Sequence, residues 1–292
     1  MSISYVIEKF FYNKNRSVPV FREYDKRRGF DAWADACRAV AKRGPADPAK
    51  NILGNQGFAH VKLMSKAEAK KIRTAADVAD GAVEDRKNAG YSQTLKASDP
   101  AFLKSVVERL ITPEVDEMLY NYFGSEFCPY WYHFSRALPN KEPKRAFLWH
   151  CDKGPSMHAK MLFYMTSVED TGGNTYLLDR PTTIKFDKAG YVFGGQKDRQ
   201  DDLSEFAAKN NIDCKPVSFD MQPGEAIMFL PQKVLHRGLL PNKLPRFIMQ
   251  VTFVPSKLHW KEVLKNRATG KVSQSAEDYA WPEHARELGV HA

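Results

Sequence analysis

The sequence predicts a single α+β domain, and three observations carry this prediction. The chain of 292 residues suits one large domain or two small ones, and its hydrophobic share of 43% and charged share of 27% are typical of globular proteins. Up to about residue 125 the apolar residues recur mainly at helical spacing, whereas from Glu126 onward they alternate as in strands. Helices first and strands later indicate an antiparallel sandwich or barrel over residues 126–256, with a mainly helical part at 1–125 packed outside it.

The N-terminal part begins with helical patterns. Residues 3–11 place isoleucine, valine and phenylalanine at helical spacing, which predicts a short amphipathic helix. We favour docking of this helix on the protein's own core over contact with a membrane surface. A second helix is predicted over residues 30–42, and a loop that contains several prolines and glycines over 44–55.

One strand and three further helices complete this part. A short strand is predicted over residues 57–63. Ser65 and Glu68 have the spacing of a capping box, which starts a helix that runs to about Val83. A pair of helices is predicted over 100–123, because proline at position 100 suits the first turn of a helix.

From residue 126 the chain reads as short strands separated by turns rich in proline, glycine and asparagine. In residues 128–137 one alternating set contains Tyr132 and the other contains His133. Further strands are predicted over 146–152, 159–167, 174–178, 225–230 and 246–254. An inserted segment, 185–215, contains a predicted helix over 198–211, and residues 257–292 form a polar C-terminal extension.

The composition favours an anionic partner. Lysine and arginine number 44 against 35 aspartates and glutamates, a net charge of +9 that suits an anionic substrate, a membrane surface or nucleic acid. A run of about 18 apolar residues is absent, so no transmembrane segment is expected, and the start of the chain does not resemble a secretory signal. The four cysteines lack CxxC spacing, which argues against a zinc ribbon and predicts a cytoplasmic protein.

The first candidate for chemistry is a His-x-Asp pair. Among eight histidines, only His150 has a carboxylate two positions on, at Asp152. Because a strand has a period of two residues, both side chains would face the same side. One imidazole and one carboxylate are two thirds of the 2-His-1-carboxylate set that binds Fe(II). The alternative is a histidine–aspartate hydrogen bond at the end of a strand.

The remaining candidates lie on later strands. His236 follows the apolar strand at 226–230 and could supply a third ligand from a distant part of a barrel. Arg246 shares one face of its strand with Gln250 and Thr252. An arginine on a barrel strand needs an anionic partner, and its guanidinium matches a carboxylate. A salt bridge to a surface acid is the alternative.

Together these segments resemble the Fe(II)/2-oxoglutarate-dependent dioxygenases, specifically the phytanoyl-CoA dioxygenase-like branch. The resemblance runs from about residue 57 to 254, and its specific part is the spacing of ten residues from His236 to Arg246. It rests on WHCD at 149–152, GEAIMF at 224–229, LHRG at 235–238, R-x-x-x-Q-x-T-F from Arg246, and the opening unit at 57–72.

The resemblance implies a double-stranded β-helix, or jelly roll, with a metal inside one open end. His150, Asp152 and His236 would bind Fe(II), and Arg246 would pair with the distal carboxylate of 2-oxoglutarate. The cosubstrate would be decarboxylated to succinate while molecular oxygen oxidises the substrate. Because related halogenases replace the carboxylate ligand with a small residue, Asp152 favours hydroxylation. The chain lacks the P-G-S-H segment common in the family, which weakens the transfer of an acyl-CoA substrate.

Five other residues near these motifs have less specific expectations. Tyr132 and His133 are candidates for hydrogen bonding to 2-oxoglutarate or substrate, although ordinary packing is the alternative for each. Lys160 shares a strand face with apolar residues, and exposure at the entry of the strand is the favoured interpretation over contact with an anion. Cys151 and its neighbour Trp149 should face away from the metal and pack in the core.

We therefore expect an Fe(II)- and 2-oxoglutarate-dependent oxygenase that hydroxylates, or otherwise oxidises, a small molecule, and the net charge favours an anionic one. One alternative is a non-catalytic β-barrel module that binds a small molecule. A second alternative, an oxygenase acting on nucleic acid, is not favoured, because the aromatic residues at 130–134 belong to an apparent core strand. The substrate and the oligomeric state stay open.

Overall fold

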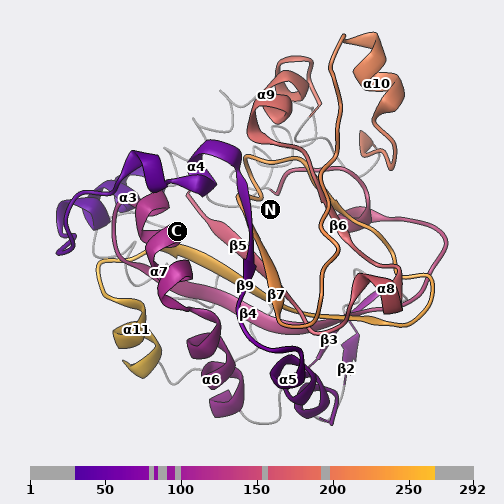
Figure 1. Ribbon diagram of the computed structural model, residues 1–292. Helices are drawn as coiled ribbons and strands as arrows, with labels where there is room; N and C mark the ends of the chain where they lie inside the picture. Colours follow the sequence, from indigo (N-terminus) through magenta and orange to yellow (C-terminus); the bar gives the residue numbers. More distant parts are fainter. Residues whose placement is uncertain are drawn as a thin grey trace, which may run out of the picture.

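The computed structural model describes residues 30–78, 82–84, 91–95, 100–152, 157–191 and 198–266. The helix predicted over residues 3–11 and most of the C-terminal extension lie outside these ranges. Figure 1 shows a long twisted sheet with several helices gathered on one side of it, and with loops, the short strand β6 (Thr175–Leu177) and further helices on the other.

The long sheet is antiparallel throughout, in the order β1-β7-β5-β9-β4-β3-β2. A second, two-stranded sheet pairs β6 with β8. The strands are β1 (Phe58–Lys62), β2 (Ala82–Glu84), β3 (Ser92–Leu95), β4 (Phe127–Ala137), β5 (Ala159–Tyr164), β6 (Thr175–Leu177), β7 (Glu225–Phe229), β8 (His236–Gly238) and β9 (Arg246–Pro255).

Two single bridges widen the small sheet. His150 pairs with His236 on one side of it, and Leu177 pairs with Val217 on the other. From β4 to β9 the chain therefore crosses repeatedly between the two sheets: β4, β5, β7 and β9 lie in the large one, and residue 150, β6, residue 217 and β8 in the small one. This alternation is the topology of a jelly roll. The predicted double-stranded β-helix is confirmed.

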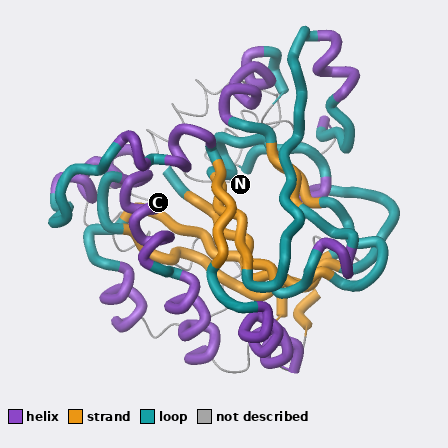
Figure 2. Tube along the Cα trace, viewed as in Figure 1, coloured by secondary structure: helices purple, strands orange, loops and turns teal. Residues whose placement is uncertain are grey.

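A group of helices covers the outer face of the large sheet, on the side away from β6 (Figures 1 and 2). Those nearest to β4 and β9 are α3, α6, α7 and α11. The α-helices are α3 (Phe30–Ala39), α4 (Ile52–Gln56), α5 (Lys66–Val78), α6 (Pro100–Leu110), α7 (Pro113–Phe123), α8 (Val168–Thr171), α9 (Arg180–Lys188), α10 (Ser204–Lys209) and α11 (Trp260–Asn266). Two short 3₁₀ helices, η1 (Pro48–Lys50) and η2 (Arg145–Phe147), interrupt the loops.

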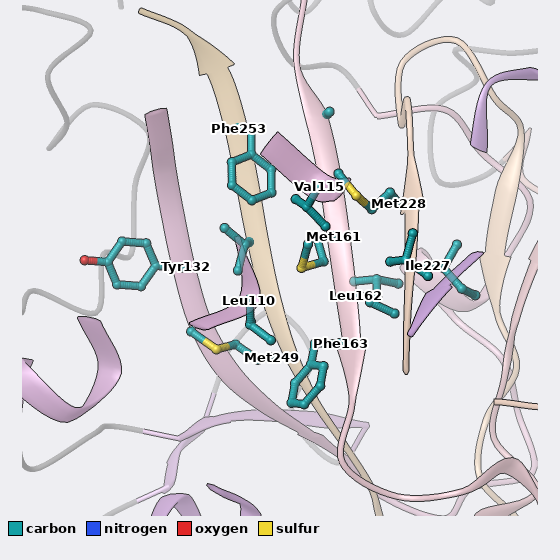
Figure 3. Packing of buried hydrophobic residues seen from close by; sticks show 14 of the residues in the cluster. Leu110, Val115, Tyr132, Met161, Leu162, Phe163, Ile227, Met228, Met249 and Phe253 are labelled. Atoms are coloured by element: carbon teal, nitrogen blue, oxygen red, sulfur yellow. The ribbon is translucent and has the colours of Figure 1, made fainter. Parts of the chain in front are cut away.

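The main hydrophobic core lies between this helical layer and the large sheet. Figure 3 shows Met161 and Phe163 of β5 and Phe253 of β9 near Leu110 of α6 and Val115 of α7. All five side chains are fully buried. Burying each such side chain stabilises the fold by about 1.5–3 kcal/mol. The core therefore packs against the outer face of the large sheet, and the inner face of the sheet is left to line a cavity.

Most elements agree with the sequence prediction, and the capping box is confirmed. The Ser65 amide and hydroxyl both donate to the Glu68 carboxylate, and the Glu68 amide donates back to the Ser65 hydroxyl. The predicted end of this helix at Val83 is wrong, because α5 reaches Val78 and Val83 lies in β2. β2 pairs with β3, a hairpin partner that the sequence analysis did not predict.

Two other segments differ from their predictions. The loop at 44–55 contains η1 and α4, because Asp47 and Asn51 each accept a hydrogen bond from a backbone amide in the following turn. The helix predicted over 198–211 is limited to α10.

The strand predicted over 146–152 is also wrong as a continuous element. It begins with η2 and then forms only the bridge at His150, because its amides find partners in separate segments. The amides of Trp149, His150 and Asp152 donate to carbonyls of residues 200, 236 and 231, respectively.

The segment after β6 builds a second hydrophobic cluster. Phe186 of α9, Ala207 of α10 and the intervening Leu203 pack with Trp149 and Cys151. Trp149 and Cys151 are buried, as predicted, on the side of their segment opposite to His150 and Asp152. The insert is therefore attached directly to the back of the His-x-Asp motif.

Candidate active site

The two candidate histidines are joined through their backbones. The His150 amide donates to the His236 carbonyl at 3.0 Å, and the His236 amide donates to the His150 carbonyl at 2.9 Å. Because the residues form a directly opposed pair, their side chains leave the small sheet on the same face. The imidazole centroids lie 4.4 Å apart, with the rings inclined at 48°.

Each imidazole is oriented by a carbonyl two residues earlier. His150 Nδ1 donates to the Leu148 carbonyl at 2.7 Å, and His236 Nδ1 donates to the Val234 carbonyl at 2.9 Å. A carbonyl can only accept, so both rings carry a proton on Nδ1 in these bonds. The Nε2 lone pairs are thereby free to face the interior, as metal-binding histidines require.

Asp152 brings its carboxylate to the same point. Its Oδ1 lies 3.3 Å from His150 Nε2 and 3.8 Å from His236 Nε2. One ligand atom from each of the three residues lies within 4.8 Å of the others. Two imidazoles and one carboxylate suit a divalent transition metal such as iron. The structure thus brings together the three residues that the sequence analysis selected.

Electrostatics keep this donor set ready for a cation. Burial opposes ionisation of Asp152, but the Lys160 ammonium and the neighbouring histidines outweigh it and hold the pKa of the carboxyl well below its usual range. Burial, together with the nearby His150, lowers the pKa of His236 well below its ordinary value. At neutral pH the site therefore presents an ionised carboxylate and a neutral His236 imidazole, the protonation states of metal ligands.

Lys160 reaches the site from β5. Its Nζ forms an ion pair with Asp152 Oδ2, and its side chain is 13% exposed. The interpretation of Lys160 as an exposed residue at the entry of a strand is therefore wrong. Its strand face is the inner face of the jelly roll, and the half-buried carboxylate of Asp152 stabilises the inward ammonium.

Arg246, the first residue of β9, is buried without an acidic partner. Only 5% of the residue is exposed, and no salt bridge joins it to any aspartate or glutamate in the described ranges. Its Nη1 donates to the Asn174 carbonyl, while the buried Nε has no hydrogen-bond partner. A buried guanidinium in this state is costly, and a carboxylate ligand would satisfy it in a bidentate manner.

Gly173 makes room for the arginine. A Cβ at this position would meet the Arg246 Cδ at 3.3 Å and the Pro241 backbone at 3.1 Å. The absence of a side chain therefore lets the stem of Arg246 pass close to the backbone.

The three candidate metal ligands, Lys160 and Arg246 all line one cavity of about 240 Å³. The cross-strand register places Arg246 and Lys160 at opposite ends of its sheet wall, with Gln250 between them. The charged residues in the lining are Asp152, Lys160 and Arg246. The lining comprises Ser92, Thr94, Trp131, His133, Ser135, Ala137, Ala146, Phe147, His150, Asp152, Lys160, Leu162, Thr175, Phe229, His236, Gly238, Arg246, Ile248 and Gln250.

Tyr132 and His133 are separated by the alternation of β4. His133 lines the cavity, and its ring stacks on that of Trp131 at 4.6 Å between centroids. Tyr132 lies on the opposite face, in the main hydrophobic core beside the helices (Figure 3). The structure therefore brings His133 to the candidate site and does not bring Tyr132 there, because successive side chains of a strand point in opposite directions.

The sequence analysis missed one wall of the cavity. Ser92 and Thr94 of β3 extend the inner face beyond β4, opposite Ala137 and Ser135. β3 is short and lacks the apolar alternation of a core strand, so periodicity offered little signal for it.

Within the described ranges, none of the helices has the length and hydropathy of a membrane-spanning segment.

Comparisons with known proteins find likeness only among solved structures. No protein-family model and no curated protein matches the sequence. EctD from S. alaskensis in its apoform is 15% identical, covering 80% of this chain and 89% of its own, with a TM-score of 0.48. The non-heme alpha ketoglutarate dependent carbocyclase SnoK from nogalamycin biosynthesis is 16% identical, covering 80% and 94%, with a TM-score of 0.46. A Pseudomonas putida prolyl-4-hydroxylase is 11% identical, covering 71% and 97%, with a TM-score of 0.43.

Proposed function

We propose that this protein is an Fe(II)- and 2-oxoglutarate-dependent oxygenase that oxidises a small molecule. One observation carries the proposal: a two-histidine, one-carboxylate cluster faces the same cavity as a buried arginine that has no acidic partner among the described residues. The cluster suits iron, and the arginine suits the carboxylate of a cosubstrate. Either feature alone has a structural explanation, but a non-catalytic fold has no need for both in one cavity.

In this proposal His150 Nε2, Asp152 Oδ1 and His236 Nε2 hold the metal. The hydrogen bonds from both Nδ1 atoms to backbone carbonyls orient the imidazoles before any metal arrives. Iron with 2-oxoglutarate supplies the oxidising chemistry, in which molecular oxygen is activated as the cosubstrate becomes succinate and carbon dioxide. The three ligands occupy one side of the cation and leave the other side to ligands from the cavity.

Arg246 binds the far carboxylate of the cosubstrate in this proposal. Its Nε is the buried donor that such a carboxylate would satisfy. The nearby Tyr164 ring, 5.9 Å from the guanidinium carbon, and the Asn174 carbonyl hold the arginine in place. His133 and Gln250 lie on the wall between Arg246 and Lys160, where they can contact cosubstrate or substrate.

We infer a small and anionic substrate from the size and charge of the cavity. A volume of about 240 Å³ admits small molecules. Lys160 and Arg246 give its lining two positive charges against one negative charge from Asp152. The dianionic cosubstrate and a divalent metal cancel each other, so one net positive charge is left for the substrate.

Hydroxylation is the reaction that we favour over halogenation, because Asp152 occupies the position where a halide would otherwise bind the metal. The protein's setting is inferred to be the reducing cytoplasm, in agreement with the four free thiols at positions 37, 128, 151 and 214.

The test is cosubstrate turnover without a primary substrate. Protein reconstituted anaerobically with Fe(II) is mixed with 2-oxoglutarate and then exposed to oxygen, and succinate is measured. We expect slow succinate formation that is lost in His236→Ala and in Arg246→Ala. The matched control is His60→Ala, which removes a histidine from β1 that is paired with Glu225 outside the cavity.

An anaerobic titration distinguishes the remaining outcomes. The parent protein with Fe(II) should develop a metal-to-ligand absorption band when 2-oxoglutarate is added. A band without succinate would indicate that turnover waits for the true substrate. The absence of both would overturn the proposal and favour the non-catalytic binding module.

A further inference from the structure

We propose that Lys160 is a positioning residue that holds Asp152 by one oxygen and so keeps this carboxylate a one-oxygen metal ligand. The inference rests on the proposed function, because it takes His150, Asp152 and His236 as the metal site. It adds a role for a buried lysine that neither binds the metal nor pairs with the cosubstrate.

The two oxygens of the Asp152 carboxylate face different partners. Oδ1 is directed toward the imidazoles, at 3.3 Å from His150 Nε2 and 3.8 Å from His236 Nε2. Oδ2 is bound by the Lys160 ammonium. A metal placed among the three donors would therefore meet Oδ1, while Oδ2 is already engaged. Rotation of the carboxylate toward two-oxygen binding would draw Oδ2 away from the ammonium, so the ion pair opposes that rotation.

Lys160 comes from a rigid element, whereas Asp152 does not. In β5, Lys160 is paired on one side with Phe229 of β7 and on the other with Thr252 of β9. Asp152 follows a single bridge at residue 150 and belongs to no regular strand. Among the described residues, its backbone makes one hydrogen bond, from its amide to the Pro231 carbonyl at 2.7 Å. The ion pair thus ties Asp152, on its irregular segment, to a strand that is hydrogen-bonded on both sides, and so restrains the carboxylate.

The number of coordination positions makes this restraint functional. Iron in such sites has six positions, and three protein ligands leave three for small molecules. A chelating cosubstrate needs two of these and oxygen needs one. If Asp152 bound through both oxygens, it would occupy one of the three. By engaging Oδ2, Lys160 keeps all three positions available.

A purely electrostatic role predicts the opposite effect on metal affinity. An ammonium close to a dication repels it, so deleting that charge would tighten metal binding. A positioning lysine has the reverse effect, because its loss releases the carboxylate and weakens the site. Removal of groups that orient metal ligands typically costs about 10–100-fold in affinity. The sign of the change therefore separates the two roles.

The experiment titrates metal-free protein with Co(II) alone, whose visible spectrum reports both affinity and coordination number. We expect Lys160→Gln and Lys160→Met to bind Co(II) about 10–100-fold more weakly than the parent, with an altered visible spectrum. Lys160→Arg, which keeps a cationic donor, should restore the parent spectrum. The matched control is Lys233→Gln, since Lys233 lies near Tyr122 outside the cavity.

Two results would overturn the inference: Co(II) affinity that is unchanged or tighter in Lys160→Gln, or parent-like spectra in both uncharged variants. Infrared difference spectra of the parent with carboxyl-labelled aspartate provide a second measurement that needs no variant. One-oxygen binding gives a wide separation of the two carboxylate stretches, and a narrow separation would refute the inference even if the variants fail to fold. If the parent itself binds no Co(II), the proposed function fails instead.

Discussion

His150 and His236 exchange both of their backbone hydrogen bonds, at 3.0 and 2.9 Å, while their Nε2 atoms face one oxygen of Asp152. The separation of the two imidazoles is therefore set by a sheet bridge rather than by a bound ion. A metal that enters finds both rings already placed, so little ordering of side chains opposes binding.

The first prediction concerns deletion of one imidazole. His236→Ala should weaken Fe(II) or Co(II) binding by at least roughly 100-fold, because a ligand is lost, yet keep the fold, because the bridge uses only backbone atoms. Isothermal titration for affinity and circular dichroism for folding test both parts. Loss of the folded state, or unchanged affinity, would contradict it. His60→Ala, on the edge strand β1, should leave metal affinity as it is.

The second prediction concerns the buried guanidinium. Arg246→Met should weaken 2-oxoglutarate binding by roughly 100-fold, because charged hydrogen bonds contribute about 1.5–3 kcal/mol each. Metal affinity should change less than about threefold, and the ligand-free protein should lose at most about 1 kcal/mol, because the desolvation cost of the charge disappears with it. Anaerobic titration and urea unfolding measure these quantities. A large loss of stability would show instead that Arg246 serves the fold.

The third prediction concerns the space beside that arginine. A Cβ at Gly173 would press on the Arg246 Cδ at 3.3 Å and on the Pro241 backbone. Gly173→Ala should therefore cost about 1–3 kcal/mol of stability and weaken 2-oxoglutarate binding, with metal affinity unchanged. Gly44→Ala is the matched control, because nothing lies within 4 Å of a Cβ there. Equal effects of the two substitutions would refute a local contact.

The fourth prediction separates two neighbours in sequence. His133→Ala should weaken binding of 2-oxoglutarate or of substrate, since His133 lines the cavity. Tyr132→Phe should leave 2-oxoglutarate affinity within about twofold, since Tyr132 belongs to the core on the other face of β4. The anaerobic absorption band measures the 2-oxoglutarate affinity of each variant. A loss confined to Tyr132→Phe would contradict the assignment of the two faces.

The fifth prediction concerns alkaline pH. Burial raises the pKa of Cys37 from 9.0 to about 12 and that of Tyr191 from 10.0 to about 12. Above pH 9 the unfolded chain releases these protons first, so it binds fewer protons than the folded protein, and the free energy of unfolding falls as pH rises toward 12. Cys37→Ala should reduce this slope by roughly 1.4 kcal/mol per pH unit between pH 9 and 12. Urea unfolding at several pH values measures it, and an unchanged slope would exclude Cys37 as a contributor.

Local patterns in the sequence were sufficient to predict the elements whose partners lie on a regular face. The strands that became β1, β4, β5, β7 and β9 are long enough for apolar alternation to appear, and the capping box at Ser65 depends only on its own turn. The pair of candidate ligands His150 and Asp152 was also selected by its spacing. These features share one property, which is that their determinants lie within a few residues of each other.

The remaining features depend on partners distant in the sequence. The segment at 146–152 has the pattern of a strand, but its amides donate to carbonyls of residues 200, 231 and 236. No local pattern in the sequence identifies these partners. Lys160 lies on a face whose direction, inward or outward, depends on the second sheet. Its inward position is explained by its ion pair with Asp152, a residue that does not belong to the large sheet. Long-range contacts of this kind leave no periodic signal.

The alternation of residues 149–152 connects the candidate active site to a hydrophobic cluster outside the cavity. Two of these side chains border the cavity, and the other two, Trp149 and Cys151, are packed among residues of the insert such as Phe206 and Ile212. Substitutions that change the size of these insert residues are expected to shift the histidine and the carboxylate without changing the residues that line the cavity. Sequence variation in the insert would therefore change metal affinity without changing the residues that contact the substrate.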